Sequence, residues 1–581
     1  MEEKKLTKHD IWITIVLAVL IGMVSCSVLG FFAEGMDAPI RYNGGDDFEM
    51  IYQVKQLTEE TWLWSTDKLG APFGQKVYDY SYCFLQNTEY FLIKVISFFT
   101  KNVPFIVNLI FMLTFVFCGV FSYLMLRKMG IKYLLAACGA LLFAFSPYIL
   151  MRGISHFCIA VCYFVPISVY FCYRSYMDEN FLKFDRSLFS FKTLLVLAGC
   201  VCIANNGIGY YPFFTCFLLC VTALCKFLDT KKIKTIIPMV KLVVCISAFM
   251  FISLLPTFIY HAKNGSYTAA IRNLTGVEVY GLKPAQFFVP LYGHNIGWVG
   301  EFVTKYNDNM PLVNENKSSY LGVLACLGLL WGLICIFKKD KESDTEIFFF
   351  GRLNLASILM MSVGGFISIL AVATNMDFMR GFNRISIFVE FCCITILCFG
   401  TQRLLDGMSK KTGKCLAMGL IVALTIFGLW DQTPSLYSDG VELRMSRENW
   451  ASDEAFVQEI EALLQPNDMV FQLPYHKFPE GGKVNKMGDY ALFTGYIHSN
   501  DIRWSYGAVR GREADAWNET IAGLEIPDMI DSIIQAGFRG IYIDRRAYSD
   551  EEFEGLVAEI EAKTGTEYIE SKNGNLVFFI L

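Results

Sequence analysis

Long apolar segments recur along most of this chain, and they constrain its fold more than any other feature. Residues 11–32 form the first of them. A helix of about 20 apolar residues crosses the hydrocarbon core of a bilayer, so this segment predicts a transmembrane helix. About ten further segments predict the same, with approximate bounds 103–126, 133–151, 155–173, 192–206, 210–228, 237–260, 319–337, 348–373, 385–404 and 414–430. Charged residues make up only 18% of the chain, against about 25% in soluble domains. We therefore predict an α-helical polytopic membrane protein with about eleven transmembrane helices, which excludes a soluble enzyme.

Basic residues gather in every second connection between the apolar segments. They lie in the ranges 4–8, 127–132, 174–186, 231–234, 338–341 and 403–414. Cytoplasmic loops carry the excess of Lys and Arg in membrane proteins, so we predict a cytoplasmic N-terminus. Loops 33–102, 261–318 and 374–384 then lie outside, and an odd number of spans puts the C-terminal part outside as well. The expected location is the plasma membrane, which the chain crosses several times.

The composition changes sharply after Trp430, where the last apolar segment ends. We predict a transmembrane domain over residues 1–435 and a soluble extracytoplasmic domain over residues 436–581. In the second part, segments with helical spacing of apolar residues alternate with short apolar runs typical of strands. The predicted helices are 453–464, 527–536 and 550–562, with Ser549 as the N-cap of the last, and the predicted strands are 469–473, 540–544 and 575–580. This alternation indicates a small α/β domain.

A cluster of acids follows the first apolar segment, in the sequence Asn43-Gly-Gly-Asp-Asp-Phe-Glu49. A carboxylate can take a proton from a hydroxyl, so Asp46 and Asp47 are candidate catalytic residues and Glu49 is a candidate for substrate binding. The two glycines allow a close backbone approach. One aspartate could instead orient the substrate or a divalent cation, Mg²⁺ or Mn²⁺, because these ions prefer hard oxygen ligands. A solvated acidic loop without function is the alternative.

Arginines stand at the predicted outer mouth of two spans. Arg380 and Arg384 precede one span, and Arg152 follows another. A guanidinium binds phosphate through two parallel hydrogen bonds, so these three are candidate ligands of a lipid phosphate. The alternative is structural pairing with an acid such as Asp377 or Glu390. Glu390 lies inside an apolar span, where an acid is costly and is a functional candidate by default.

The remaining candidates for substrate contact are His156, Tyr280, Lys283 and His294. His156 lies in the short connection between the third and fourth spans, and the other three lie in the outer loop 261–318. Aromatic and short polar groups can line a sugar site, although aromatic residues also collect at membrane interfaces. In the C-terminal part, His476 and His498 lack the spacing of zinc ligands. The net charge of −5 gives no support for nucleic-acid binding. The sequence also lacks the motif of a phosphate-binding loop, so we do not expect ATP-driven transport by this chain.

Three motifs carry a resemblance to a known group of proteins. These are Gly45-Asp-Asp-Phe-Glu49, Leu69-Gly-Ala-Pro-Phe-Gly74 in the same outer loop, and Arg380-Gly-Phe-Asn-Arg384-Ile-Ser386. Together with the soluble C-terminal part, they resemble bacterial multi-span proteins of the YfhO-like group, which are similar to glycosyltransferases of the GT-C fold. The resemblance covers most of the chain.

The resemblance implies an inverting glycosyltransferase. Its donor would be a polyprenyl-phosphate-linked monosaccharide, and its acceptor a cell-envelope glycopolymer or another lipid-linked glycan on the outer face. In GT-C enzymes an acid of the first outer loop acts as the base, which maps onto Asp46 or Asp47, and arginines near the donor phosphate map onto Arg380 and Arg384. Some of these enzymes need a metal ion and others do not, so the cofactor stays open. A donor synthase and a flippase would be further partners.

Two other classes of function stay open at the level of sequence. One is a transporter or flippase of lipid-linked sugars, and the other is a non-catalytic protein of cell-envelope assembly. A flippase needs a polar path at the bilayer midplane, but Lys241, Arg352 and Glu390 lie nearer the ends of the apolar segments than their centres. Acids gather at one face of the membrane instead, which favours chemistry at that face.

Overall fold

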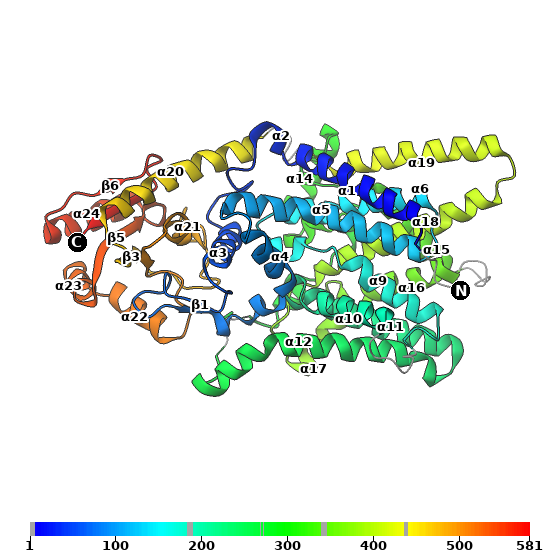
Figure 1. Ribbon diagram of the computed structural model, residues 1–581, viewed down its shortest axis with the longest axis horizontal. Helices are drawn as coiled ribbons and strands as arrows, with labels where there is room; N and C mark the ends of the chain where they lie inside the picture. Colours follow the sequence, from blue (N-terminus) through cyan, green and yellow to red (C-terminus); the bar gives the residue numbers. More distant parts are fainter. Residues whose placement is uncertain (1–5, 183–189, 268, 271, 338–344, 435–439) are drawn as a thin grey trace.

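The molecule is elongated, with a bundle of helices at one end and a small mixed sheet at the other (Figure 1). The computed structural model describes residues 6–182, 190–267, 269–270, 272–337, 345–434 and 440–581. The predicted domain boundary at 435/436 falls outside the described residues, as do the basic residues at 4–5, 183–186 and 338–341. A helical membrane domain followed by an α/β part confirms the predicted class of fold.

Eight helical segments of the described chain are long and apolar enough to cross a membrane. They are α1 (Lys8–Val28), α5 (Val103–Lys128), α6 with α7 (Tyr133–Ala144 and Pro147–Arg152), α8 with α9 (Phe157–Ala160 and Val165–Met177), η3 with α11 (Gly207–Gly209 and Tyr210–Thr230), η4 with α12 (Ile233–Ile236 and Ile237–Asn264), η7 with α18 (Phe382–Ile385 and Ser386–Gly407) and α19 (Lys411–Gln432). Each coincides with a predicted span. The other three predicted spans coincide with shorter helices, α10 (Phe191–Ala204), α15 (Val323–Ile336) and α16 (Thr345–Met361).

The predicted span 348–373 is wrong in its length, because the helix stops at a pair of glycines. α16 ends at Met361, and α17 (Phe366–Thr374) begins only after Gly365. Gly364 has a left-handed backbone with φ of 71°, a conformation that favours glycine. At Gly365 a Cβ atom would lie 2.6 Å from the carbonyl oxygen of Met360. The two glycines therefore interrupt the helix, and α17 is a separate helix that precedes Arg380 in the chain.

Ion pairs gather at the end of the bundle that faces away from the sheet. Among the described residues, examples are Asp10–Arg127, Asp229–Arg352, Lys132–Asp406 and Glu346–Arg403. They include cations of the connections that the charge pattern assigns to the cytoplasm. The outer loops and the C-terminal part lie at the opposite end (Figure 1). The basic connections and the predicted outer loops thus lie at opposite ends of the bundle, as the charge pattern predicts. Which end faces the cytoplasm stays a prediction from that pattern.

Two long connections fill the space between the bundle and the sheet. The first carries α2 (Phe31–Glu34), α3 (Asp46–Glu59), β1 (Ser65–Thr66), β2 (Gln75–Lys76), η1 (Val77–Asp79), η2 (Ser81–Leu85) and α4 (Asn87–Ser97), and the second carries α13 (Gly276–Val279), η5 (Pro284–Phe287), α14 (Gly297–Asn309) and η6 (Asn314–Ser318). The acids after the first span therefore begin a helix rather than lie in a loop. Acids in a first helical turn are stabilised by the positive end of the helix dipole.

The C-terminal part is built on a five-stranded sheet with the order β4-β3-β5-β7-β6. β3 pairs in parallel with β4 and β5, whereas β7 pairs antiparallel with β5 and β6. The strands are β3 (Met469–Leu473), β4 (Arg503–Trp504), β5 (Phe538–Asp544), β6 (Ile569–Glu570) and β7 (Leu576–Ile580), and the helices are α20 (Val441–Leu463), α21 (Thr494–His498), α22 (Glu513–Ala522), α23 (Ile526–Ala536) and α24 (Asp550–Thr564).

The predicted elements of this part agree with the structure in type. Ser549 caps α24 as predicted, and its hydroxyl is 2.8 Å from a carboxylate oxygen of Glu552 in a capping box. The helix predicted at 453–464 begins much earlier, at Val441, because its polar first half lacks the apolar spacing that marks a helix in sequence. β4 and β6 were not predicted, because each strand has only two residues and so shows no alternation of apolar and polar residues.

The first outer connection ties the C-terminal part to the bundle. The backbone N–H of Tyr490 donates to the carbonyl oxygen of Gly44 at 2.9 Å. Arg512 donates to both oxygens of the buried Asp79 carboxylate at 2.7 and 2.8 Å, and His261 of α12 lies 2.8 Å from the same group. One carboxylate thus joins the outer connection, a bundle helix and the C-terminal part.

Candidate active site

A cavity of about 420 Å³ lies where the outer ends of the bundle helices meet the C-terminal part. α3, which stands between the bundle and the sheet in Figure 1, forms one of its walls. Its acidic, basic and imidazole lining residues are Asp46, Glu49, His156, Arg272, Glu315, Arg380, Arg384, Glu480 and Asp489. Five of the residues predicted from sequence therefore face one space, although Arg380 and Arg384 are far from Asp46 in the chain.

The two adjacent aspartates point to different places because they occupy successive positions in the first turn of α3. The Asp46 side chain faces the cavity and is 46% exposed. Asp47 is fully buried, and its Oδ2 accepts a hydrogen bond from the backbone N–H of Asn43 at 2.8 Å. Asp47 therefore holds the turn that precedes the helix. This narrows the predicted pair to Asp46 as the candidate base and gives Asp47 a structural role.

The surroundings raise the pKa of both acids on the α3 wall. Burial and the charge of Asp489 raise the pKa of Asp46 to about 6. Burial and the charge of Asp46 raise the pKa of Glu49 to about 8. At pH 7 Asp46 is therefore mostly ionised, whereas Glu49 is mostly protonated. A carboxylate with a pKa just below the ambient pH suits a general base.

His156 stands beside the Asp46 carboxylate, with 3.6 Å between its Nε2 and Asp46 Oδ2. Burial and the positive charge of Arg152 lower the pKa of His156 to about 3. The imidazole is therefore neutral at physiological pH, so it can direct an N–H toward Asp46 without neutralising it. The backbone N–H of His156 donates to the carbonyl oxygen of Arg152 at 3.1 Å, which fixes both residues in one turn.

Glu315 joins two of the predicted arginines into one buried cluster. Its Oε2 accepts hydrogen bonds from Arg152 Nη1 at 2.6 Å and from Arg384 Nε at 3.2 Å, and its Oε1 accepts from Arg384 Nη2 at 3.1 Å. Burial alone would raise the pKa of Glu315, but the charges of Arg384 and Arg152 hold it well below its usual range. Glu315 is therefore ionised and surrounded by arginines. Arg152 does not line the cavity itself and is linked to it by its hydrogen bond to Glu315.

Two further arginines bring positive charge to the wall. Arg272 donates to Glu480 Oε1 at 2.8 Å. The Arg380 guanidinium lies 4.9 Å from the centre of the Tyr280 ring, and its Nε is buried without a hydrogen-bond partner in the described part of the chain. Arg380 is thus the lining arginine for which the described residues supply no carboxylate.

The C-terminal part closes the cavity with residues of the segment between β3 and α21. Glu480, Asp489 and Tyr490 all line it. Asp489 Oδ1 accepts from the backbone N–H of Gly482 at 2.8 Å and lies 3.2 Å from His476 Nε2. The cavity therefore needs both parts of the molecule to be complete.

Three predicted substrate residues of the loop 261–318 do not line the cavity. Tyr280 lies behind Arg380, under its guanidinium. The Lys283 ammonium donates to the carbonyl oxygen of Pro311 at 2.5 Å, and the buried His294 lies 3.2 Å from Asp431. The loop spreads over the ends of several helices, so neighbours in sequence are separated in space. The assignments of Lys283 and His294 to the substrate site are corrected on this ground.

The partner of Glu390 is a serine of another helical segment rather than Arg384. Glu390 Oε2 accepts a hydrogen bond from Ser146 Oγ at 2.6 Å, whereas Arg384 pairs with Glu315. Ser146 is the N-cap of α7. The intramembrane acid therefore holds a helix break in the bundle rather than an arginine.

Sequence reasoning missed Glu315, Glu480 and Asp489 as lining residues. Glu315 is a single acid in a long polar loop, and the other two belong to a domain far from α3 in the chain. The one available signal was the stretch 474–488, where Pro and Gly indicate an irregular loop, and such loops often carry functional residues.

A metal site is not evident among the described residues. No group of three His, Cys, Asp or Glu side chains is placed there to hold one ion. The Mg²⁺ or Mn²⁺ considered from the sequence stays an expectation.

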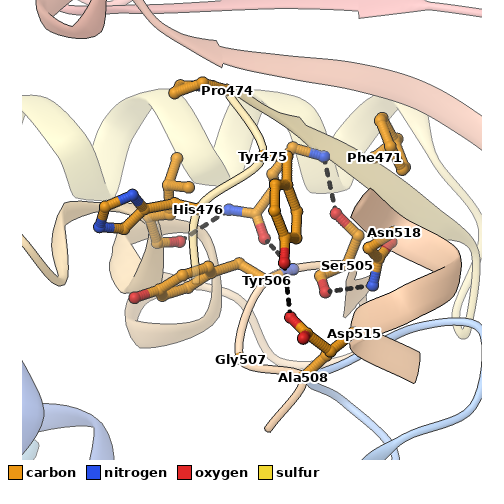
Figure 2. A pocket seen from close by; sticks show the side chains of 12 residues that line it. Phe471, Pro474, Tyr475, His476, Ser505, Tyr506, Gly507, Ala508, Asp515 and Asn518 are labelled. Carbon is orange, nitrogen blue, oxygen red and sulfur yellow. Dashed lines mark hydrogen bonds between the residues drawn. The ribbon is translucent and has the colours of Figure 1, made fainter. Parts of the chain in front are cut away.

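A second cavity, of about 10 Å³, lies inside the C-terminal part (Figure 2). It has room for about one water molecule. Figure 2 shows hydrogen bonds among its polar groups. Tyr475 donates to Asp515 at 2.8 Å, and Asn518 donates to the carbonyl oxygen of Ser505 at 3.2 Å. Tyr506 and Gly507, which follow β4 in the chain, also line this small space.

Comparisons with known proteins give a family and distant structural likenesses. The family described as "Domain of unknown function (DUF6311)" matches residues 90–382, and no curated protein sequence matches the chain. The chain is similar to the archaeal oligosaccharyltransferase AglB from Archaeoglobus fulgidus, solved with an inhibitory peptide and a dolichol-phosphate (10% identity, TM-score 0.48, covering 99% of this chain and 75% of that one). It is also similar to ArnT from Cupriavidus metallidurans bound to undecaprenyl phosphate (11% identity, TM-score 0.47, covering 99% and 98%). The YfhO-like resemblance stays an expectation.

Proposed function

This chain belongs to the family described as a domain of unknown function (DUF6311), and we propose that it is a membrane glycosyltransferase of the GT-C type. The proposed donor is a monosaccharide on polyprenyl phosphate, and the proposed acceptor is a cell-envelope glycan or lipid-linked glycan. One observation carries the proposal. A single cavity holds a carboxylate with the pKa of a base, Asp46, together with an arginine that has no carboxylate partner in the described chain, Arg380.

The place of the cavity supports a donor anchored in lipid. Arg384 belongs to the first turn of the span that contains α18, and Arg380 lies just before it. Guanidiniums and a helix N-terminus both favour a phosphate at this point. The volume of about 420 Å³ suits a sugar phosphate, whereas a polyprenyl chain would extend into the bilayer beside the bundle.

The proposed reaction is a direct displacement at the anomeric carbon. Asp46 takes the proton of the acceptor hydroxyl as that oxygen forms the new bond to the anomeric carbon. The bond from this carbon to the phosphate oxygen breaks, and the phosphate keeps the electron pair. Arg380, with a share of the Arg384 charge, stabilises the negative charge that develops on the leaving group. Attack from the face opposite the phosphate inverts the anomeric centre.

The proposed orientation follows from the charge pattern. The basic end of the bundle faces the cytoplasm, and the cavity and the C-terminal part face outward at the plasma membrane. Lipid-phosphate sugars would then reach the site from the outer leaflet, after a donor synthase and a flippase have acted. No nucleotide is needed, because the lipid phosphate is already an activated leaving group.

The test is sugar transfer in proteoliposomes that contain the purified chain, a labelled polyprenyl-phosphate sugar and a glycan acceptor. Wild type should form a new glycosidic bond, and Asp46→Asn should lose at least about a hundredfold in rate because the base is removed. Asp37→Asn is the matched control, since Asp37 is an exposed acid of the same outer connection. Equal rates for wild type and Asp46→Asn would refute the assignment of the base, and labelled sugar crossing the bilayer without a new bond would favour a flippase.

A further inference from the structure

Glu315 occupies the hydrogen-bonding edge of Arg384 that would otherwise meet a phosphate. Two donors of this guanidinium, Nε and Nη2, already point at the two oxygens of Glu315 at 3.2 and 3.1 Å. This is the side-by-side geometry in which an arginine also binds phosphate. Arg152 adds a third donor at 2.6 Å. Arg152 and Arg384, two of the predicted phosphate ligands, therefore already bind the carboxylate of Glu315.

The carboxylate is held in place from the backbone side. Its neighbour Asn316 accepts from the backbone N–H of Lys283 at 2.9 Å and donates to the carbonyl oxygen of Gly281 at 2.9 Å. Ser318 Oγ donates to the carbonyl oxygen of Glu315 itself at 2.8 Å. η6 is thus fixed on the C-terminal side of Glu315, so the backbone that carries this acid cannot shift without breaking these hydrogen bonds.

The guanidiniums are equally constrained. Arg384 lies 4.2 Å from the centre of the Tyr210 ring, and Arg152 donates through Nη2 to Asn383 Oδ1 at 2.9 Å. The exposed fractions of the side chains are 2% for Arg152, 8% for Arg384 and 16% for Glu315. Screening by solvent is weak at such depth, so the negative charge of Glu315 acts on any anion that enters the cavity.

We propose that Glu315 sets the affinity of the site for the prenyl phosphate by holding Arg152 and Arg384 in a shared ion pair. This rests on the proposed function. Transfer leaves a lipid phosphate in a pocket of arginines, and several free guanidiniums would bind it tightly. Turnover then needs a lower affinity for the lipid phosphate, because product release limits the rate of many enzymes. Glu315 offsets part of the positive charge and leaves Arg380 as the main ligand, so that the phosphate can leave.

A purely structural ion pair would behave in the opposite way. Loss of a structural partner disorders the arginines and weakens ligand binding. Loss of a competing anion leaves the arginines free and strengthens it. The sign of the change in phosphate affinity therefore separates the two roles, and Glu315→Gln is the suitable variant because it removes the charge and keeps the size.

The experiment measures calorimetric binding of a prenyl phosphate, and of the prenyl alcohol of the same length, to the full chain in nanodiscs. Glu315→Gln should bind the phosphate about tenfold or more tightly than wild type, with the alcohol unchanged. In the transfer assay its steady-state rate should fall relative to its own single-turnover rate, because release of the lipid phosphate becomes slower. Glu346→Gln removes a carboxylate from the Arg403 pair at the other end of the bundle and should bind like wild type.

The outcomes separate the two proposals. Equal affinity of wild type for phosphate and alcohol would count against the proposed function. A wild-type preference for phosphate that Glu315→Gln leaves unchanged or weakens would overturn the role of Glu315 alone. If Glu315→Gln does not fold, Glu315→Asp provides the test, because its shorter side chain loosens the contact with Arg384. It should also bind the phosphate more tightly than wild type, and weaker binding would overturn the role.

Discussion

The dependence of transfer on pH is the sharpest test of Asp46 as the base. Its pKa of about 6 means that about one molecule in eleven carries the ionised base at pH 5 and about ten in eleven at pH 7. The rate should therefore rise about tenfold between these values. At its ordinary pKa of 3.8, about nine-tenths of the carboxylates would already be ionised at pH 5, and the rate would hardly change.

Two variants identify which group produces the acid limb. Asp489 is the largest charge contribution to the raised pKa of Asp46, so Asp489→Asn should move the limb to lower pH. A histidine ordinarily titrates near pH 6.5 and could be mistaken for the source. Because the pKa of His156 is about 3, the limb should persist in His156→Gln, although the rate falls.

The assay is the initial rate in proteoliposomes from pH 4.5 to 8, with the lipid donor saturating at each pH. The upper part of the profile includes Glu49, whose pKa is about 8. The charge of Asp46 helps to raise the pKa of Glu49, so the two steps of the profile are not independent. A rate that is flat from pH 5 to 7, or a limb that disappears in His156→Gln, would refute the assignment of Asp46.

Two further predictions concern the link between the two parts and the orientation in the membrane. Arg512→Ala leaves the buried Asp79 carboxylate without its bidentate partner and should lower the free energy of unfolding by about 3 kcal/mol. Lys563→Ala, which breaks the exposed pair with Asp531, should cost less than about 1 kcal/mol in the same thermal denaturation in detergent. An epitope tag after Leu581 should bind antibody on intact cells, and binding only after permeabilisation would contradict the proposed orientation.

Local pattern was sufficient for the elements that depend on local chemistry. The apolar segments of about 20 residues predicted the membrane spans, because hydrocarbon thickness fixes the length of a spanning helix. Ser549 predicted a helix start, because a cap needs only the residues of the next turn. The pattern failed at 348–373, where Gly364 and Gly365 break a continuous apolar run. Apolar composition says that a segment is buried in lipid or protein, but not whether its backbone stays helical.

The candidate site divides in the same way. Asp46, Glu49, Arg380 and Arg384 stood out in the sequence, because acids and arginines beside apolar spans need a reason to be there.

The residue types alone therefore identified the charged positions that are candidates for the site. Only the tertiary structure decided between Asp46 and Asp47, because neighbours in one helical turn point about 100° apart and one of them met a backbone N–H instead of the cavity. It alone brought Glu315, Glu480 and Asp489 to the same space. The physical reason is that an electric charge acts across a few ångströms of protein, and the distance that matters is set by the packing of segments far apart in the chain rather than by their order along it.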